Sequence, residues 1–160
     1  MELYIKQRVF SWGDKFSIYN KDGNECYYVQ GEVFSWGKKL HLYAKTGMEL
    51  AFIQQKVFSF LPKYFIFRNG VQTAEVVKEF TFFKQEYSVH GLGWTVKGDF
   101  FAHDYEIYDN GTQIASVSKA WLSWGDAYRI VFEPGLDVTN ILSVVLVIDA
   151  CLEQAERSNN

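Results

Sequence analysis

Three segments in the first part of the chain repeat one pattern of apolar, aromatic and polar residues. Val9-Phe10-Ser11-Trp12-Gly13 recurs 24 residues later as Val33-Phe34-Ser35-Trp36-Gly37, and Val57-Phe58-Ser59-Phe60 follows after a further 24. Each copy leads into a stretch in which apolar and polar residues alternate, as in Lys15-Phe16-Ser17-Ile18-Tyr19. Alternation with a period of two is typical of a β-strand with one buried face. The repeat therefore predicts a series of similar β-hairpins.

Short glycine-containing turns separate the predicted strands. Asp22-Gly23, Thr46-Gly47 and Asn69-Gly70 end the three repeat units, and Asn110-Gly111 supplies a later turn. Gly and Asn tolerate the positive φ values that tight hairpin turns require. Read along the whole chain, the pattern predicts about twelve strands. They span approximately residues 3–11, 15–21, 25–35, 38–45, 49–59, 63–68, 72–82, 85–90, 93–101, 103–109, 113–122 and 127–133.

One segment, residues 138–152, departs from this period and is apolar almost all round. Pro134-Gly135 precedes it, and Asp137 is suited to cap the start of a helix. A helix that is apolar on every side is buried either in protein or in lipid. Fifteen residues rise about 22 Å, whereas a membrane span needs roughly 20 residues. We therefore expect a helix buried in the protein, with membrane insertion or an exchangeable plug as the alternatives.

A long run of antiparallel hairpins must protect its edge strands, and closing into a barrel removes them. A barrel of about eight strands is filled by its own side chains, but a wider one leaves room for a helix about 10 Å across. The predicted fold is thus mainly β: a closed twelve-stranded antiparallel barrel around a buried apolar C-terminal helix. We expect one domain over residues 1–155, followed by a short polar tail at 156–160.

Aromatic residues make up 18% of the chain, which suits a β-rich fold. Trp12 and Trp36 occupy equivalent repeat positions, and Ser123-Trp124-Gly125-Asp126 echoes them near the end. Repeated placement beside glycine at strand ends favours packing at the barrel rims. A ligand pocket or contact with a lipid interface is the alternative for these tryptophans.

The net charge of −3 offers no overall attraction to nucleic acid, so no nucleic-acid partner is expected. The charge is unevenly distributed: residues 1–100 carry 13 Lys+Arg against 10 Asp+Glu, and residues 101–160 carry 3 against 9. Four cations on outward strand faces are the candidate ligand-binding residues, namely Lys6, Arg8, Lys15 and Lys39. Lysine and arginine side chains bind phosphate, and each cation near an anionic membrane contributes about 1 kcal/mol. A merely solvated barrel wall is the alternative interpretation.

Motifs for catalysis and metal binding are missing from the sequence. It contains no G-x-S-x-G, H-E-x-x-H, G-x-G-x-x-G or P-loop, and its three histidines are scattered. We therefore predict no enzymatic activity, no catalytic residue, no cofactor and no metal, with a calcium site at Asp104, Glu106 and Asp109 as a weak alternative. Cys26 and Cys151 lack metal spacing and are expected to be reduced thiols. The N-terminal residues do not form a secretory signal, which favours a cytoplasmic location.

Several motifs in this order resemble the LURP-one-related family. They are Val9-Phe10-Ser11 with Ile18-Tyr19 and Asp22-Gly23, then Gly98-Asp99-Phe100 with Asp104-Tyr105-Glu106-Ile107, then Ser123-Trp124 with Asp126 and Tyr128, and finally Pro134-Gly135 with Asp137 and the apolar run ending in Ile148-Asp149. The resemblance covers nearly the whole chain. It implies the Tubby C-terminal-like fold, shared with phospholipid scramblases, in which a twelve-stranded barrel encloses a C-terminal helix.

The resemblance also implies a class of function. Tubby domains bind phosphoinositide headgroups through basic residues on the outer wall, and scramblases act at membranes. No catalytic residues are attributed to the LURP-one-related branch, and this chain lacks the cysteine cluster that anchors scramblases by acylation. We thus expect a non-catalytic cytosolic barrel that binds an anionic ligand, such as a phospholipid or phosphoinositide headgroup, peripherally and weakly on its basic face. The alternative is a structural or protein-interaction module with no small-molecule ligand.

Overall fold

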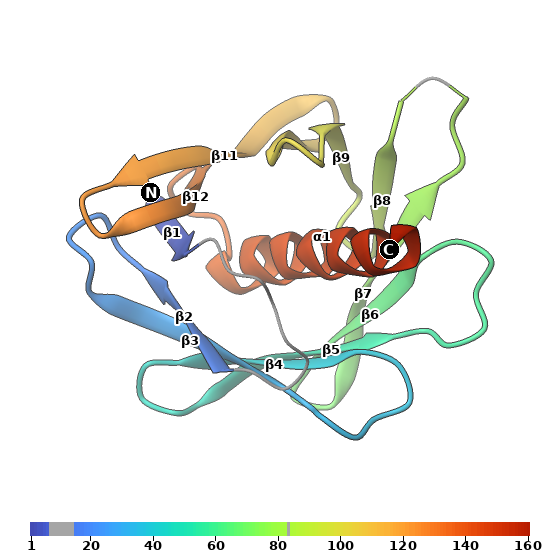
Figure 1. Ribbon diagram of the computed structural model, residues 1–160, viewed down its shortest axis with the longest axis horizontal. Coiled ribbons are helices and arrows are strands. Elements are labelled where there is room, and N and C mark those ends of the chain that lie inside the picture. The colour runs from blue at the N-terminus through green and yellow to red at the C-terminus, as the bar shows by residue number, and fades with distance from the viewer. Residues whose placement is uncertain (7–14, 83) are drawn as a thin grey trace.

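The computed structural model describes residues 1–6, 15–82 and 84–160, and shows a β-barrel wrapped around one helix (Figure 1). The strands are β1 (Glu2–Lys6), β2 (Lys15–Tyr19), β3 (Glu25–Gly31), β4 (Lys39–Ala44), β5 (Glu49–Gln55), β6 (Lys63–Arg68), β7 (Val71–Glu79), β8 (Glu86–His90), β9 (Trp94–Asp99), β10 (Asp104–Asp109), β11 (Thr112–Leu122) and β12 (Gly125–Phe132). The helix is α1 (Val138–Asn159).

Each strand pairs in antiparallel fashion with the strands that precede and follow it, and β1 pairs with β12 to close the barrel. Glu2 lies opposite Val131 and Lys6 lies opposite Ala127 in this closing pair. Closure leaves no strand with an unpaired edge in the ring, which removes a site of aggregation. The closed twelve-stranded antiparallel barrel with a C-terminal helix, predicted from the repeat, is confirmed.

Helix α1 runs along the interior of the barrel (Figure 1). Asp137 caps its start as predicted, because its side chain accepts a hydrogen bond from the amide of Thr139 at 2.9 Å. Thr139 and all residues from Ile141 to Leu152 are buried, and most of them are apolar. The helix is long and apolar enough to span a membrane by length and composition, but in this structure its apolar part fills the barrel. It extends beyond the predicted 138–152 and includes most of the residues expected to form a tail.

Alternation within the strands supplies the other half of the core. Inward side chains such as Ile18, Leu42, Ile53 and Ile66 are at most 1% exposed and pack around α1. The turns use the predicted chemistry, since Asn110 has φ 47° and Gly111 has φ 80°. These positive values let β10 and β11 join through a tight turn.

Strands β3, β5 and β7 end three or four residues earlier than the sequence pattern predicts. Residues 32–38, 56–62, 80–82 and 84–85 are loops, whereas the sequence pattern predicts strand up to residues 35, 59 and 82. The ladder between β3 and β4 shows why, because its last paired residues are Gly31 and Leu40. The aromatic residues of the second and third copies of the repeat therefore lie beyond the paired part of their hairpins. We call these three segments, which project beside the C-terminal end of α1, the loop end (Figure 1).

Candidate functional site

The predicted ligand-binding lysines lie on the outer surface of the barrel. The ammonium of Lys6 is 6.0 Å from the ring centroid of Trp124, and that of Lys15 is 4.1 Å from the ring centroid of Tyr28. Lys39 is 3.8 Å from a carboxylate oxygen of Glu32. Arg8 lies outside the described residues.

The three described lysines lie on β1, β2 and β4, of which β1 and β2 pair directly while β3 separates β2 from β4. Lys15 and Lys39 begin β2 and β4, which flank β3. Lys6 ends β1 and faces the hairpin of β11 and β12, where Trp124 lies. Each lysine already contacts an aromatic ring or a carboxylate, so phosphate binding by these residues stays a prediction.

The loop end is attached to α1 by polar contacts. Lys38, in the loop between β3 and β4, forms an ion pair with Glu153 of the helix. The side-chain amide of Gln55, at the end of β5, donates to the side-chain oxygen of Gln154 at 3.0 Å. These contacts place the bases of two loops against the last turns of the helix.

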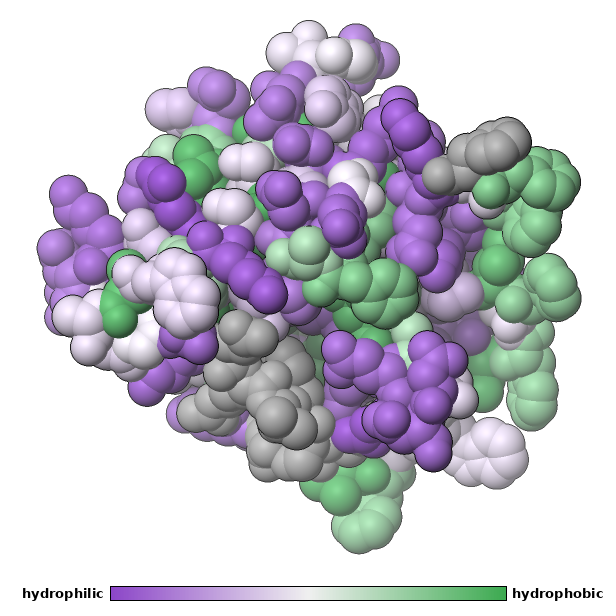
Figure 2. All heavy atoms as spheres, turned by 45° about the horizontal axis from the view of Figure 1, so that its top comes forward, coloured by the Kyte–Doolittle hydropathy of each residue, from purple (hydrophilic) through white to green (hydrophobic). Residues whose placement is uncertain are grey.

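Aromatic side chains project from the tips of all three loops. Phe34 is 101% exposed, Trp36 78%, Phe58 92%, Phe60 95%, Phe80 67% and Phe82 85%. Figure 2 shows hydrophobic residues gathered along the right-hand side of the molecule, the side from which these loops project in Figure 1. A soluble monomer seldom leaves large apolar side chains exposed together without a functional reason.

The rim-packing prediction for the repeated tryptophans is thus wrong for Trp36. It holds for Trp124, whose ring lies 5.4 Å from that of Tyr19 and 6.4 Å from that of Tyr4. Trp12 lies outside the described residues. The difference arises because the long β11–β12 hairpin brings Trp124 against neighbouring strands, whereas the loop carrying Trp36 projects away from the wall.

The sequence contains a signal for the aromatic tips, although its apolar residues are also typical of a strand. An aromatic residue, a hydroxyl residue and a second aromatic residue follow one another in each loop, as Phe34-Ser35-Trp36, Phe58-Ser59-Phe60 and Phe80-Thr81-Phe82. Phe82 also lies 24 residues after Phe58, in phase with the repeat. Both flanking residues are large and apolar, so burial was the natural expectation.

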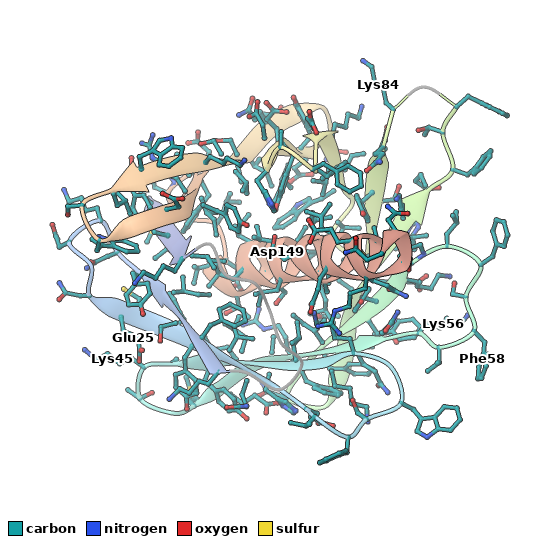
Figure 3. All side chains as sticks on the ribbon, in the orientation of Figure 1. Glu25, Lys45, Lys56, Phe58, Lys84 and Asp149 are labelled. Atoms are coloured by element: carbon teal, nitrogen blue, oxygen red, sulfur yellow. The ribbon has the colours of Figure 1, made fainter. Side chains whose placement is uncertain are left out.

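Lysines accompany these aromatic residues. Lys56 and Lys84 are exposed on two of the loops, and within the described ranges neither forms an ion pair. Lys63 at the start of β6 is instead 2.9 Å from a carboxylate oxygen of Glu75. Figure 3 shows Lys56 and Phe58 on one loop and Lys84 on the next, whereas Lys45 and Glu25 lie toward the opposite side of the barrel. The loop end therefore combines exposed rings with two exposed lysines that form no ion pair within the described part of the chain.

A groove of about 590 Å³ lies beside the last of these loops, between β8 and β10. Its lining includes Lys84, Lys97 and Tyr108, but also Glu86 and Glu106. Lys97 lies opposite both glutamates in the strand register. Carboxylates on both neighbouring strands offset its charge, so the groove does not favour an anion as the exposed loops do.

His41 forms a polar cluster with Glu32 and Glu49 on the outer wall of β4. Its Nδ1 is 2.9 Å from Glu49, and its Nε2 is 2.8 Å from Glu32. Burial lowers the pKa of His41, but its hydrogen bonds to the two glutamates outweigh burial, and its pKa is raised overall. In its protonated form the ring would donate from both nitrogens to these carboxylates and would have no lone pair free to act as a general base. Across the described residues, no group of three or more His, Cys, Asp and Glu is arranged to hold a metal.

Asp149 is the one acidic side chain of α1 that lies deep inside the barrel (Figure 3). The pKa of this carboxyl is raised to about 7, chiefly by burial; nearby Lys38 lowers it and Glu153 raises it. One carboxyl oxygen of Asp149 and the hydroxyl of Tyr105 are buried without a hydrogen-bond partner among the described residues. Burial also raises the pKa of Tyr105, and the charge of Asp149 adds to that effect. The interior therefore favours a neutral, protonated Asp149.

Comparison with known proteins agrees with this geometry. The model of the LURP-one-related family matches residues 1–149. The uncharacterized protein YxjI of Bacillus subtilis (strain 168) is 37% identical over 156 residues, which cover 98% of this chain and 96% of that protein. A solved structure of an Arabidopsis thaliana protein has the same fold, with a TM-score of 0.68 and 20% identity over 92% of this chain and 88% of that one. This chain therefore belongs to the LURP-one-related family.

Proposed function

We propose that this LURP-one-related barrel is a non-catalytic domain that docks peripherally onto anionic phospholipid surfaces with its loop end. The observation that carries the proposal is the pair of exposed lysines, Lys56 and Lys84, on adjacent loops with no ion-pair partner among the described residues. Each such cation near an anionic membrane contributes about 1 kcal/mol, so the binding is weak, reversible and sensitive to salt. A cytoplasmic protein with this property would partition between the cytosol and the membrane surface.

The arrangement of the cations favours a surface over a single small anion. Lys56 and Lys84 lie on different loops, and the nearest groove has carboxylates on both sides of Lys97. A bilayer presents many phosphates and carboxylates side by side, so separated cations engage it together. The lipid-headgroup binding that the resemblance to Tubby-like domains implies supports the same class of ligand.

Vesicle flotation tests the proposal directly. The full chain is mixed with two kinds of vesicle, one of phosphatidylcholine alone and one in which about one third of the lipid is phosphatidylserine. Each mixture is measured at low and at high salt. We expect flotation only with the anionic vesicles at low salt. Equal, negligible flotation with both compositions would remove the proposal.

Charge reversal locates the binding surface. The double variant Lys56→Glu/Lys84→Glu should weaken binding about tenfold or more, because two attractions become repulsions. Lys45→Glu is the matched control, since Lys45 is exposed in the turn between β4 and β5, away from the loop end (Figure 3). A variant Lys6→Glu separately tests the outer wall of the barrel, where the sequence places the candidate ligand-binding lysines. A larger effect of Lys6→Glu than of the loop variant would assign binding to that wall.

A protein-interaction module is the second candidate, and the exposed aromatic rings of the loop end are the observation that favours it. Aromatic residues are enriched at the centres of protein interfaces. A stoichiometric partner that is recovered with the wild-type chain but lost with Phe58→Ser, in a chain that shows no vesicle binding, would select this function.

A further inference from the structure

We infer that the aromatic tips of the loop end insert into the interfacial layer of an anionic bilayer and anchor the barrel there. This inference rests on the proposed function and adds to it a part of the protein that enters the lipid. The residues concerned are Phe34, Trp36, Phe58, Phe60, Phe80 and Phe82.

The local structure of the loops displays the rings instead of burying them. In the first loop, the hydroxyl of Ser35 donates to the carbonyl of Gly37 at 2.7 Å, so the polar side chain is satisfied within the loop. The aromatic residues on either side, Phe34 and Trp36, are both exposed. In the third loop, Phe80 and Phe82 contact each other edge to face, with ring centroids 5.4 Å apart. Each loop thus presents a pair of exposed apolar rings, and in the first loop the residue between them is hydrogen-bonded within the loop.

The backbone of the middle loop points to an external partner. Phe58 has φ 61°, in the left-handed region that bulky side chains rarely occupy. Its ring is 92% exposed, so the unfavourable backbone conformation is not offset by burial of the ring in the fold. Unusual backbone conformations of this kind concentrate where a protein binds something else.

Lipid suits this surface better than a second copy of the chain. Aromatic side chains favour the membrane interface, where their rings lie at the level of the headgroups, and lysines beside them attract anionic lipids. Lipids rearrange around separate protrusions, so the three loops need no preformed complementary groove. A two-fold dimer through the same loops would instead bring Lys56 and Lys84 close to the same lysines of its partner.

Replacing the rings without changing charge isolates insertion from electrostatic docking. Phe58→Ser/Phe60→Ser removes the apolar pair from one loop, and Met48→Ser removes an exposed apolar side chain from the turn between β4 and β5 as the matched control. Partition onto phosphatidylserine-containing vesicles is measured over a range of salt concentrations. We expect the loop variant to bind about tenfold more weakly than wild type, and the control to bind like wild type. Far-UV circular dichroism confirms that each variant is folded.

The outcomes separate this inference from the proposed function. Wild type should retain part of its binding at high salt, whereas the loop variant should keep only the salt-sensitive part. If wild type and Phe58→Ser/Phe60→Ser bind equally well with the same salt dependence, docking stands but insertion is wrong. If wild type does not bind anionic vesicles, both proposals fall. A wild-type dimer that the same substitutions dissociate, with unchanged vesicle binding, would also overturn insertion.

Discussion

The ammonium of Lys38, in the loop between β3 and β4, forms an ion pair with the carboxylate of Glu153 in the last turns of α1. Both side chains are only 10% exposed. Arg157, one turn further along the helix, is 2.7 Å from the other oxygen of the same carboxylate. The first loop of the loop end is therefore attached to the helix that fills the barrel, and the stability of one depends on the other.

Removing one partner of this pair should destabilise the protein. Lys38→Ala leaves Glu153 largely buried, with Arg157 on the same helix as its remaining ion-pair partner among the described residues, and we expect a loss of about 2 kcal/mol in the free energy of unfolding. Urea unfolding measures the loss. The double variant Lys38→Met/Glu153→Met should recover much of it, because no largely buried charge is then left unpaired at this position, and Arg157, which loses Glu153, is half-exposed. Equal stability of wild type and Lys38→Ala would show that the pair does not hold the loop.

Asp149 should make folding depend on pH in an unusual direction. Its carboxyl has a pKa of about 7 in the folded barrel, chiefly because of burial, against an ordinary value of 3.8. The folded state thus holds a proton that the unfolded state releases between these values. The contribution of Asp149 to stability is present below about pH 4 and is lost as pH rises through 7, by up to about 4 kcal/mol.

Asp149→Asn tests this dependence, because an amide keeps the shape of the carboxyl without its charge. Relative to wild type, the variant should gain stability as pH rises from 5 to 8, as measured by urea unfolding at each pH. Asp104→Asn, at an exposed position of β10, is the control and should leave the pH profile unchanged. Parallel profiles for wild type and Asp149→Asn would contradict the buried, protonated state.

Asp137, which caps α1, should contribute to stability with the opposite pH dependence to Asp149. Burial raises the pKa of Asp137, but its hydrogen bonds with Arg68 and with the Thr139 amide lower it by more, so its pKa is reduced overall. Its contribution is therefore present at neutral pH and is lost as pH falls through the folded-state pKa. Asp137→Ala should cost about 1 kcal/mol at pH 7, whereas Asp137→Asn should cost less because it can still cap the helix. Thermal unfolding of wild type and both variants at pH 7 and pH 3 measures these losses. The difference in stability between wild type and Asp137→Ala should be smaller at pH 3.

Gly98 allows β9 and β10 to approach closely. Its φ is 145°, and an added Cβ would lie 2.5 Å from the Asp104 carbonyl oxygen and 2.5 Å from the Cα of Tyr105. Gly98→Ala should therefore reduce the free energy of unfolding by well over the ~1 kcal/mol expected from backbone strain alone. Gly111→Ala is the control, because a Cβ at that turn meets nothing within 4 Å and adds only the strain of positive φ. Equal losses for the two variants would show that the strands can separate without cost.

The repeat and its alternation were enough to predict the barrel, the helix and their order, because each depends on local period and on edge protection. Ile18 and Leu42 occupy inward positions that their alternation already indicated. The strand ends were predicted less well, since the pattern does not show where ladder pairing stops. Phe34 and Phe58 look like core residues in sequence, and only the register places them beyond the last pair.

The candidate site was harder to predict because it depends on which charges find partners. Lys39 and Lys63 occupy equivalent positions of the repeat. In the fold, Lys39 lies near Glu32 and Lys63 lies near Glu75. Lys56 and Lys84 do not share a repeat position, and the topology places both on the loop end. The ion pair between Lys38 and Glu153 joins residues 115 positions apart, a separation that no local pattern reveals.

The most direct test of the account is the depth of the loop end in a bilayer. A fluorophore on Ser59→Cys, in a Cys26→Ser background that leaves only the buried Cys151, is compared with the same fluorophore on Met48→Cys. Quenching by spin-labelled lipid is measured on phosphatidylserine-containing vesicles. The account predicts strong quenching at position 59 and little at position 48. Equal quenching at both positions, or none at either, would contradict insertion of the loop end.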